Sequence, residues 1–177
     1  GPYWKPVFNL LEDHFTVILA NAQQVKSLPG KKTDRKDGRR LAHFLRHNLI
    51  EGSFIPPVAI RQLRDLTRRR RKLLGAGGSE RNRVQKVLED ANVKLGNVLS
   101  DVFGASGQAM LEALLSNQGT PQQLAEFARG KLRRKMPEIV TAVEEHRMRE
   151  HHRFLIRQSL RHMAFLEEQV AALDEEI

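Results

Sequence analysis

The sequence of 177 residues predicts a mainly α fold in which long helices form a coiled-coil region, preceded by a truncated α/β segment. Three observations indicate this. From Val58 onward, apolar residues recur at intervals of three and four, as on the buried face of a helix. Residues 15–20 form a continuous apolar run with the length of a strand buried on both faces. No apolar run approaches the roughly 20 residues of a membrane span.

Composition narrows the class of partner. Lysine and arginine total 30 against 21 acidic residues, which gives a net charge of +9 and favours a polyanion, nucleic acid first. Cysteine is absent, which excludes disulfides and thiolate metal sites. Only 6% of residues are aromatic, so the sequence does not suggest an aromatic platform for base stacking.

The first third reads helix, strand, helix, strand. Residues 3–12 predict a short amphipathic helix, residues 15–20 a strand, and residues 21–30 a polar loop. A helix from Asp34 to about Asn48 follows, then a short strand at 53–55 that ends at two prolines. Two strands make only a piece of a sheet. Either the missing strands lie upstream of Tyr3, or the segment is partly ordered, or another chain completes it.

Residues 58–103 predict helices with one interruption. Ile60, Leu63 and Leu66 line one face of the first helix. The glycine-rich residues 75–78 are expected to break this helix or form a turn, and Ser79 and Glu80 restart it. A heptad-like seam follows, made of Val84, Leu88, Ala91, Leu95, Val98 and Val102.

The remaining residues predict a turn at 104–107, a short helix to Leu115, and a helix capped by Thr120 and Pro121. One helix is then expected from Met136 to Ile177. It reads as half of a coiled coil, paired with residues 80–103 or with a second copy. Homodimerisation is expected through Ile156, Met163, Leu166, Val170 and Leu173.

Asp34 and Asp37 are the candidate metal-binding and catalytic residues. They are three residues apart on one helix face, in line with Leu41 and Phe44, where a hard cation such as Mg²⁺ could bind carboxylate oxygen. Capping of the helix N-terminus is the alternative role for these carboxylates.

Two basic blocks are the candidate nucleic-acid surfaces. The first is carried by the helix after Val58, and the second comprises Lys131, Arg133, Arg134 and Lys135. The alternative is a solvated helix face. The phosphate-contact candidates are Lys31, Lys32, Arg61, Arg64, Arg68, Arg69, Arg70, Arg71 and Lys72.

Four histidines in the last helix could suggest a metal site. His151 and His152 are adjacent and so point to different faces of a helix, and His162 lies too far along the axis. Polar contacts along the seam or with a partner are therefore favoured over metal binding for His146, His151, His152 and His162.

The sequence resembles the DEDD transposases of bacterial insertion sequences, family one hundred and ten, which are close to the Piv-type invertases. The resemblance covers essentially residues 3–177, and its most specific motif contains both Asp34 and Asp37. Residues 75–78 depart from it, because the family is usually charged and helical there. The motifs, in order, are Tyr3-Trp4-Lys5-Pro6, Asn21-Ala22-Gln23, Pro29-Gly30-Lys31-Lys32-Thr33-Asp34-Arg35-Lys36-Asp37, Leu45-Arg46-His47, Gly52-Ser53-Phe54-Ile55-Pro56-Pro57, Leu63-Arg64-Asp65-Leu66-Thr67-Arg68 and Asn82-Arg83-Val84-Gln85-Lys86-Val87-Leu88-Glu89.

This resemblance implies a cytoplasmic bacterial DNA recombinase that uses Mg²⁺ and is guided to DNA by a structured RNA. It implies that residues 3–57 are the end of an RNase H-like (RuvC-like) domain and residues 58–177 the helical coiled-coil region. Gly1-Pro2, independently of the resemblance, is typical of the scar left by a cleaved purification tag. Asp34 and Asp37 match the last two acids of the family's tetrad. The first two acids would precede Tyr3 and a serine domain would follow Ile177, so the fragment is expected to be inactive while the parent is an enzyme. The alternative is a non-enzymatic helical module that binds nucleic acid or assembles proteins.

Overall fold

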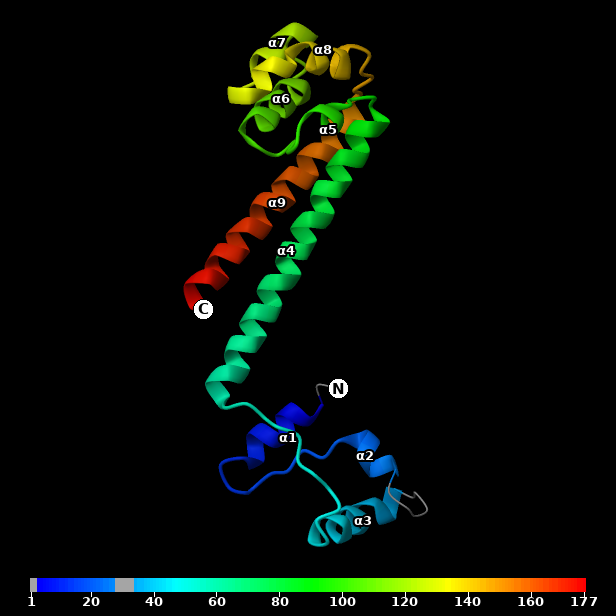
Figure 1. The fold of residues 1–177 in the computed structure, drawn as a ribbon, viewed down its shortest axis with the longest axis vertical. Coiled ribbons are helices and arrows are strands. Elements are labelled where there is room, and N and C mark those ends of the chain that lie inside the picture. Colours follow the sequence, from blue (N-terminus) through cyan, green and yellow to red (C-terminus); the bar gives the residue numbers. More distant parts are fainter. Residues whose placement is uncertain (1–2, 28–33) are drawn as a thin grey trace. The chain divides into compact units, whose positions relative to one another are not determined.

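The computed structural model describes residues 3–27 and 34–177. For residues 34–36 it describes the backbone but not the side chains. These residues fold into helices joined by short loops, so the mainly α fold is confirmed (Figure 1). None of the described helices has the length and hydropathy needed to cross a membrane. The helices are α1 (Trp4–Leu11), α2 (Ala22–Ser27), α3 (Asp34–Arg46), α4 (Val58–Asp90), α5 (Leu95–Val98), α6 (Ala105–Leu115), α7 (Pro121–Glu126), the 3₁₀ helix η1 (Gly130–Lys135), α8 (Met136–Glu144) and α9 (Glu150–Glu176).

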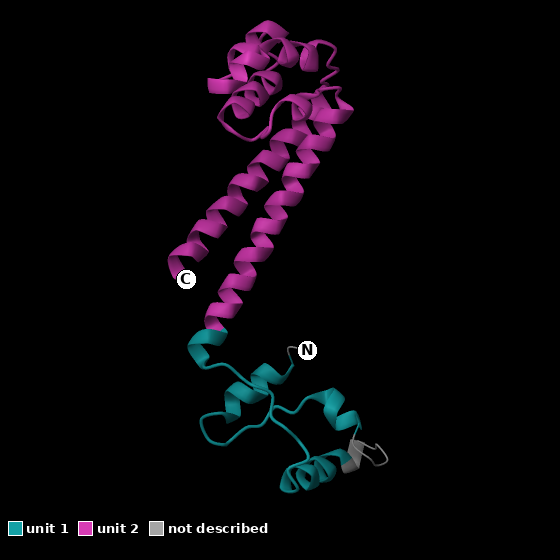
Figure 2. Ribbon diagram, in the orientation of Figure 1, with its two compact units in different colours: residues 1–61 teal, residues 62–177 magenta. Residues whose placement is uncertain are grey.

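The chain divides into two compact units (Figure 2). Unit 1 comprises residues 1–61 and holds α1, α2, α3 and the first turn of α4. Unit 2 comprises residues 62–177 and holds the rest. The predicted boundary at 57/58 coincides with the first residue of α4.

The two strands predicted in unit 1 do not form among the described residues. Residues 15–20 and 53–55 are extended, and their only sheet pairing is an isolated antiparallel bridge between Ala20 and Gly52. Beside it, the backbone N–H of Ser53 donates to the carbonyl of Leu19 at 2.7 Å. Two extended segments without further strands cannot extend a ladder. Phe15 accordingly remains 66% exposed instead of buried on both faces.

The segment predicted as a polar loop contains α2. Asn21 begins this helix, because its side-chain oxygen accepts from the backbone N–H of Gln23 at 2.9 Å. The predicted helix from Asp34 is confirmed as α3, which stops before Asn48. Asn48 has a φ of 53°, a left-handed conformation that ends helices, and the N–H of Leu49 closes back onto the carbonyl of Phe44 at 2.9 Å.

Arg61 fastens the start of α4 to α1 within unit 1. Its guanidinium donates to both carboxylate oxygens of Glu12, at 2.7 and 2.8 Å. It also lies over the ring of Phe8, 5.1 Å from the centroid. A bidentate pair combined with a cation–π contact fixes both the position and the plane of the guanidinium.

Unit 2 is built on α4, which runs for 33 residues without a break. The interruption predicted at residues 75–78 is therefore wrong. A helical glycine costs roughly 1 kcal/mol relative to alanine, but tertiary packing on both sides of the glycines offsets this cost. Leu73 before them and Val84 and Leu88 after them are buried.

α9 returns alongside α4 and covers this buried face (Figure 1). Ile156, Met163 and Leu166 of α9 are 0%, 7% and 6% exposed. The predicted seam residues Val84, Leu88, Ala91, Leu95 and Val102 belong to the same core, and Val98 packs at its edge. Only the part of the seam up to Asp90 lies on the long helix, because Asn92 adopts a φ of 56° and turns the chain away.

One acid is buried between the two long helices. Glu80 is 5% exposed, and its carboxylate accepts from Nδ1 of His162 at 3.0 Å. Burial raises the pKa of Glu80, but the hydrogen bonds from Ser159 and His162 and the charge of Arg83 outweigh burial and lower the pKa overall. His162 is thus a polar contact across the seam.

The single helix predicted from Met136 to Ile177 is wrong, since α8 ends at Glu144 and α9 begins at Glu150. The loop between them binds the loop after α4. The N–H of Arg147 donates to the carbonyl of Ala91 at 2.7 Å, and the N–H of Lys94 donates to the carbonyl of Ala142 at 2.8 Å. Backbone groups that a continuous helix would use internally are therefore committed to this junction between the two loops.

α5, α6, α7, η1 and α8 form a helical lobe inserted between α4 and α9 (Figure 1). The predicted Thr120 cap is confirmed as a capping box with Gln123, and Pro121 occupies the first turn. The turn predicted at 104–107 is wrong in position, because α6 begins at Ala105. Gly107 lies inside this helix against the preceding turn, where a Cβ atom would sit 2.1 Å from the carbonyl oxygen of Val102.

Two arginines of α9 fix the lobe to the long helices. Arg153, which is 9% exposed, donates from Nε to the carbonyl of Leu114 at 3.3 Å. Arg157 donates to the carbonyl of Leu115 at 2.6 Å. Both carbonyls belong to the last turn of α6, where cations are favoured by the helix dipole and satisfy unpaired acceptors.

Substitution of the glycines by alanine is expected to have opposite effects at two positions. Gly75→Ala should stabilise the chain by about 0.5–1 kcal/mol, because no atom lies within 4 Å of the added Cβ and the helix gains propensity. Gly107→Ala should destabilise it by about 1–3 kcal/mol, because the added Cβ meets backbone. Urea unfolding of both variants measures the difference, and equal effects at the two sites would contradict the packing described.

Acidification is expected to loosen the junction between α8 and α9. Burial lowers the pKa of His146 and the charge of Arg153 lowers it further, and its Nδ1 accepts from the N–H of Met148 at 3.3 Å. The folded state therefore favours the neutral ring. The stabilisation that the neutral His146 ring contributes is complete when the pH is above the ordinary histidine pKa of about 6.5. It is lost as the pH falls toward the lower folded-state pKa.

The matched variant is His146→Asn, which keeps an acceptor for Met148 but does not titrate. Melting curves between pH 7.5 and 5.5 should show a smaller fall in Tm for this variant than for the wild type. Parallel slopes would mean that His146 does not contribute to the pH dependence.

Candidate nucleic-acid interface

An exposed stripe of arginines runs along α4. Arg64, Arg68 and Arg71 are spaced i, i+4 and i+7, so they share one face of the helix, and Lys72 flanks them. All four side chains are exposed. Leu73 and Val84, which are buried against α9, lie on the opposite face, at half a helical turn from the stripe. Packing against α9 therefore turns the arginine stripe (Arg64, Arg68, Arg71 and Lys72) to solvent.

The stripe has few competing carboxylates. Among the described residues, no ion pair is formed by Arg64, Arg68, Arg69, Arg71 or Lys72. The charges repel one another and are held together by the rigid helix. A polyanion that bound along this face would relieve the repulsion.

Arg70 has a different environment from its neighbours. It pairs with Asp174 of α9, and its Nη2 lies 3.2 Å from Oδ2. The hydrogen bond and the charge of Asp174 raise the pKa of Arg70. The hydrogen bond from Arg70 in turn lowers the pKa of Asp174, with burial acting weakly the other way. Arg70 thus aligns α4 with the end of α9 and does not belong to the exposed stripe.

Arg61 is a cationic candidate whose side chain is already engaged. It contacts Glu12 and Phe8 in unit 1 and is 12% exposed. Lys31 and Lys32 lie outside the described residues. Of the predicted set, the described residues therefore bring Arg64, Arg68, Arg71 and Lys72 together on one helix face.

Of the two candidate metal-binding carboxylates, only that of Asp37 is among the described side chains. Asp34 is the first residue of α3, but its side chain lies outside the description. Asp37 is half-buried in the first turn of α3 and belongs to none of the clusters of three ligating side chains among the described residues. The described residues on their own do not form a site that fits a magnesium ion, which prefers octahedral oxygen coordination.

A different cluster joins Asp90, His151 and His152, whose ligand atoms lie within 4.8 Å of one another. The two histidine rings lie 3.8 Å apart between centroids, so the expectation that they point to different faces is wrong. Nδ1 of His152 accepts the backbone N–H of Arg149 at 3.1 Å, and Nε2 lies 2.8 Å from Oδ2 of Asp90. Because a backbone N–H can only donate, a neutral His152 carries its proton on Nε2 and donates it to Asp90.

That tautomer disfavours a metal ion at this cluster. A neutral imidazole that binds a metal through Nε2 carries its proton on Nδ1, which would face the N–H of Arg149. Metal binding would therefore break the cap of α9. The arrangement instead holds the start of α9 against the end of α4.

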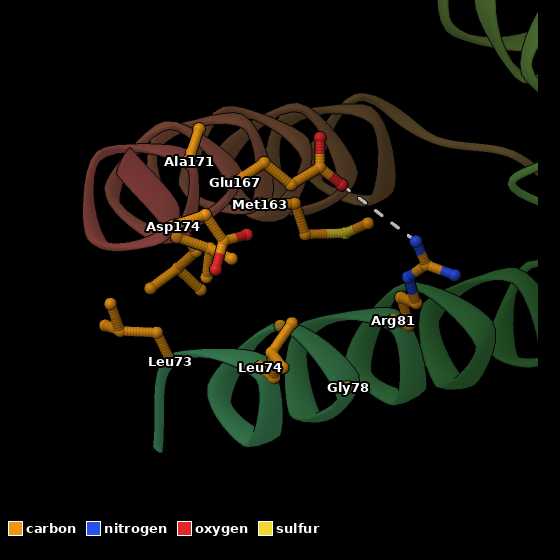
Figure 3. A pocket seen from close by; sticks show the side chains of 11 residues that line it. Leu73, Leu74, Gly78, Arg81, Met163, Glu167, Ala171 and Asp174 are labelled. Carbon is orange, nitrogen blue, oxygen red and sulfur yellow. Dashed lines mark ion pairs between the residues drawn. The ribbon is translucent and has the colours of Figure 1, made fainter. Parts of the chain in front are cut away.

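Three of the five predicted oligomerisation residues are buried within the chain. Ile156, Met163 and Leu166 are buried under α4. Val170 lines an apolar groove between the two helices, with a volume of about 500 Å³, whose walls include Leu73, Gly77 and Met163 (Figure 3). The Arg81–Glu167 ion pair, 3.9 Å long, closes one side of the groove.

Two structural roles have little signal in the sequence. The buried Arg153, which caps α6, looks like any surface arginine, and the tautomer of His152 depends on a backbone group three residues earlier. Neither periodicity nor composition encodes these contacts, because one joins α9 to the end of α6, 39 residues earlier, and the other is a single backbone bond at the start of α9.

The tautomer of His152 leads to a metal-binding prediction. Addition of equimolar Zn²⁺ should leave the Tm unchanged, whereas His152→Ala should lower stability by about 1 kcal/mol through the lost cap, with or without a chelator. His151→Ala is the matched control and should cost little. A zinc-dependent rise in Tm that disappears in His151→Ala would show that the cluster binds metal.

Comparison with known proteins gave one match. The profile of a transposase family, the DEDD transposases of the IS110 type, matches residues 1–93. A search of curated proteins and a search of solved structures each found no significant match. The matched residues contain unit 1, the arginine stripe and all of α4. Transposases of this family generally use a divalent metal ion and act on DNA. With more than half of its residues matched, the chain belongs to the DEDD transposase family of the IS110 type.

Proposed function

We propose that the chain is the part of an insertion-sequence transposase that holds nucleic acid along α4 while the parent protein recombines DNA. The exposed arginine stripe is the observation that carries this proposal. Four cations occupy one face of a rigid helix, without acidic partners among the described residues. Guanidinium groups are suited to phosphate because they donate two parallel hydrogen bonds.

The stripe would bind phosphates rather than bases. Arg64, Arg68 and Arg71 are separated by three to four residues, or about 4.5–6 Å along the helix axis. Such a row can follow a phosphate backbone in DNA or in a structured guide RNA. Each neutralised phosphate releases counterions, so affinity should fall steeply with salt.

Asp34 and Asp37 are proposed to supply two carboxylate ligands for Mg²⁺ in the parent protein. Both lie in the first turn of α3, and Asp37 shares a helix face with Phe44, which stands seven residues later and is 6% exposed. A metal ion bound there would position a reacting phosphate and stabilise its charge. Two carboxylates alone would hold Mg²⁺ weakly, so the site we propose would need further oxygen ligands.

Assembly is the third part of the proposal. The parent would act in the bacterial cytoplasm as a dimer or larger oligomer. Since Ile156, Met163 and Leu166 are covered by α4 within one chain, a second copy would use Val170 and Leu173, which are only partly buried, or would exchange α9. Light scattering at micromolar concentration tests this proposal, and a monomer at all concentrations would contradict it.

The central experiment compares two pairs of charge-removing substitutions in the whole chain. Arg68→Gln/Arg71→Gln should weaken binding to structured RNA or duplex DNA several-fold and reduce the slope of log affinity against log salt by about 2. The matched control is Arg147→Gln/Arg161→Gln, which removes the same charge from exposed positions off α4. Equal losses of affinity in both variants would show that the effect comes from net charge alone. If neither variant loses affinity, the stripe does not bind nucleic acid and the chain is better regarded as an assembly module.

A further inference from the structure

We propose that the helical lobe carries a second phosphate-binding surface, separate from the arginine stripe, at the turn that joins α7 to α8. This inference rests on the proposed function in one respect, because it takes nucleic acid as the ligand. The turn holds Arg129 and the four cations of η1, so that five of the seven residues from 129 to 135 are positively charged. All five side chains are exposed.

No carboxylate neutralises this turn among the described residues. None of the ion pairs in the described part of the chain includes Arg129, Lys131, Arg133, Arg134 or Lys135. The nearest acids in sequence, Glu126 and Glu138, are exposed and unpaired with them. A solvated surface usually mixes both signs of charge, whereas this one concentrates a single sign.

The turn is fixed to the lobe. The backbone N–H of Arg129 donates to Oγ of Ser106 in α6 at 3.1 Å. Nε of Arg133 donates to the carbonyl of Ala128, and Nζ of Lys135 donates to the carbonyl of Val98, both at 3.3 Å. Gly130 enters η1 with a φ of 57°, which glycine adopts without strain.

These contacts sort the five cations into two groups. Arg133 and Lys135 bind lobe carbonyls and hold the turn, whereas the side chains of Arg129, Lys131 and Arg134 form no hydrogen bond or ion pair among the described residues. Lys131 and Arg134 are three residues apart, and residues i and i+3 of a 3₁₀ helix lie on the same side. Because the backbone of the turn is already fixed, binding neighbouring phosphates would have to order only these two side chains.

A neighbouring aromatic side chain distinguishes nucleic acid from other polyanions. Phe127, at the end of α7, is 40% exposed and stands two residues before Arg129. An exposed ring beside phosphate-binding cations can stack on an unpaired base. We therefore assign the ligand as nucleic acid with at least one unpaired base at this turn, rather than a fully paired duplex or an acidic peptide.

The test uses Lys131→Gln/Arg134→Gln in the whole chain, with Arg68→Gln/Arg71→Gln as the α4 comparison and Arg147→Gln/Arg161→Gln as the charge control. The substituted side chains of the lobe variant are exposed and form no hydrogen bond or ion pair among the described residues, so its Tm should match that of the wild type. Affinity is measured over a salt series for an RNA hairpin with an unpaired loop, a single-stranded DNA and a duplex DNA of equal length.

The lobe variant should lose affinity several-fold and reduce the salt slope by about 2 for the hairpin or the single strand. Its effect should add to that of the α4 variant, because the two surfaces are distinct. Phe127→Ala should weaken binding of the same ligands while leaving the salt slope unchanged. The RNA and DNA arms identify which nucleic acid supplies the unpaired base.

Other outcomes separate this inference from the proposed function. If the lobe variant binds every probe as the wild type does while the α4 variant is impaired, the lobe surface is refuted and the stripe stands. If the lobe variant and the charge control lose affinity equally, the effect is one of net charge and the inference is overturned. If only the lobe variant is impaired, the lobe surface stands and the role of the stripe fails.

Discussion

The packing of α9 against α4 is the interaction on which unit 2 depends. An isolated helix gains little in water from its own hydrogen bonds, and α4 contains three glycines near its middle. Burial of Val84 and Leu88 under Ile156 and Met163 supplies what local propensity lacks. The same packing decides which side of α4 meets solvent. The arginine stripe is thus a consequence of where the apolar residues lie.

Local chemistry explains what could be predicted of the fold. The Thr120 cap, the start of α8 at Met136 and the end of α3 follow from backbone preferences of single residues. Other elements depend on distant partners. The glycines of α4 remain helical because α9 covers the flanking residues, and the break before α9 exists because Ala91 accepts a hydrogen bond from Arg147. The apolar run at 15–20 has no ladder to join among the described residues.

The candidate site likewise has residues that local spacing predicts and residues whose contacts depend on distant partners. Helical spacing alone was enough to place Arg64, Arg68 and Arg71 on one face. It could not reveal that Arg61 forms an ion pair with Glu12 or that Arg70 forms one with Asp174, because these acids lie far away in sequence. Nor could it reveal that His152 pairs with Asp90, which lies 62 residues earlier in the sequence.

The loops after α4 and α8 are bonded to each other, so the lobe is an insertion whose two ends lie close together. Ala91 and Arg147 are joined by a backbone hydrogen bond although 55 residues separate them, and Asn92 binds the carbonyl of Glu145 at 3.1 Å. The long helices would keep their register whatever the length of the excursion between these points. Related chains can therefore enlarge the lobe in evolution while the junction keeps α4 and α9 together, whereas a short connector in place of the lobe would uncover Ile156 and the buried Arg153.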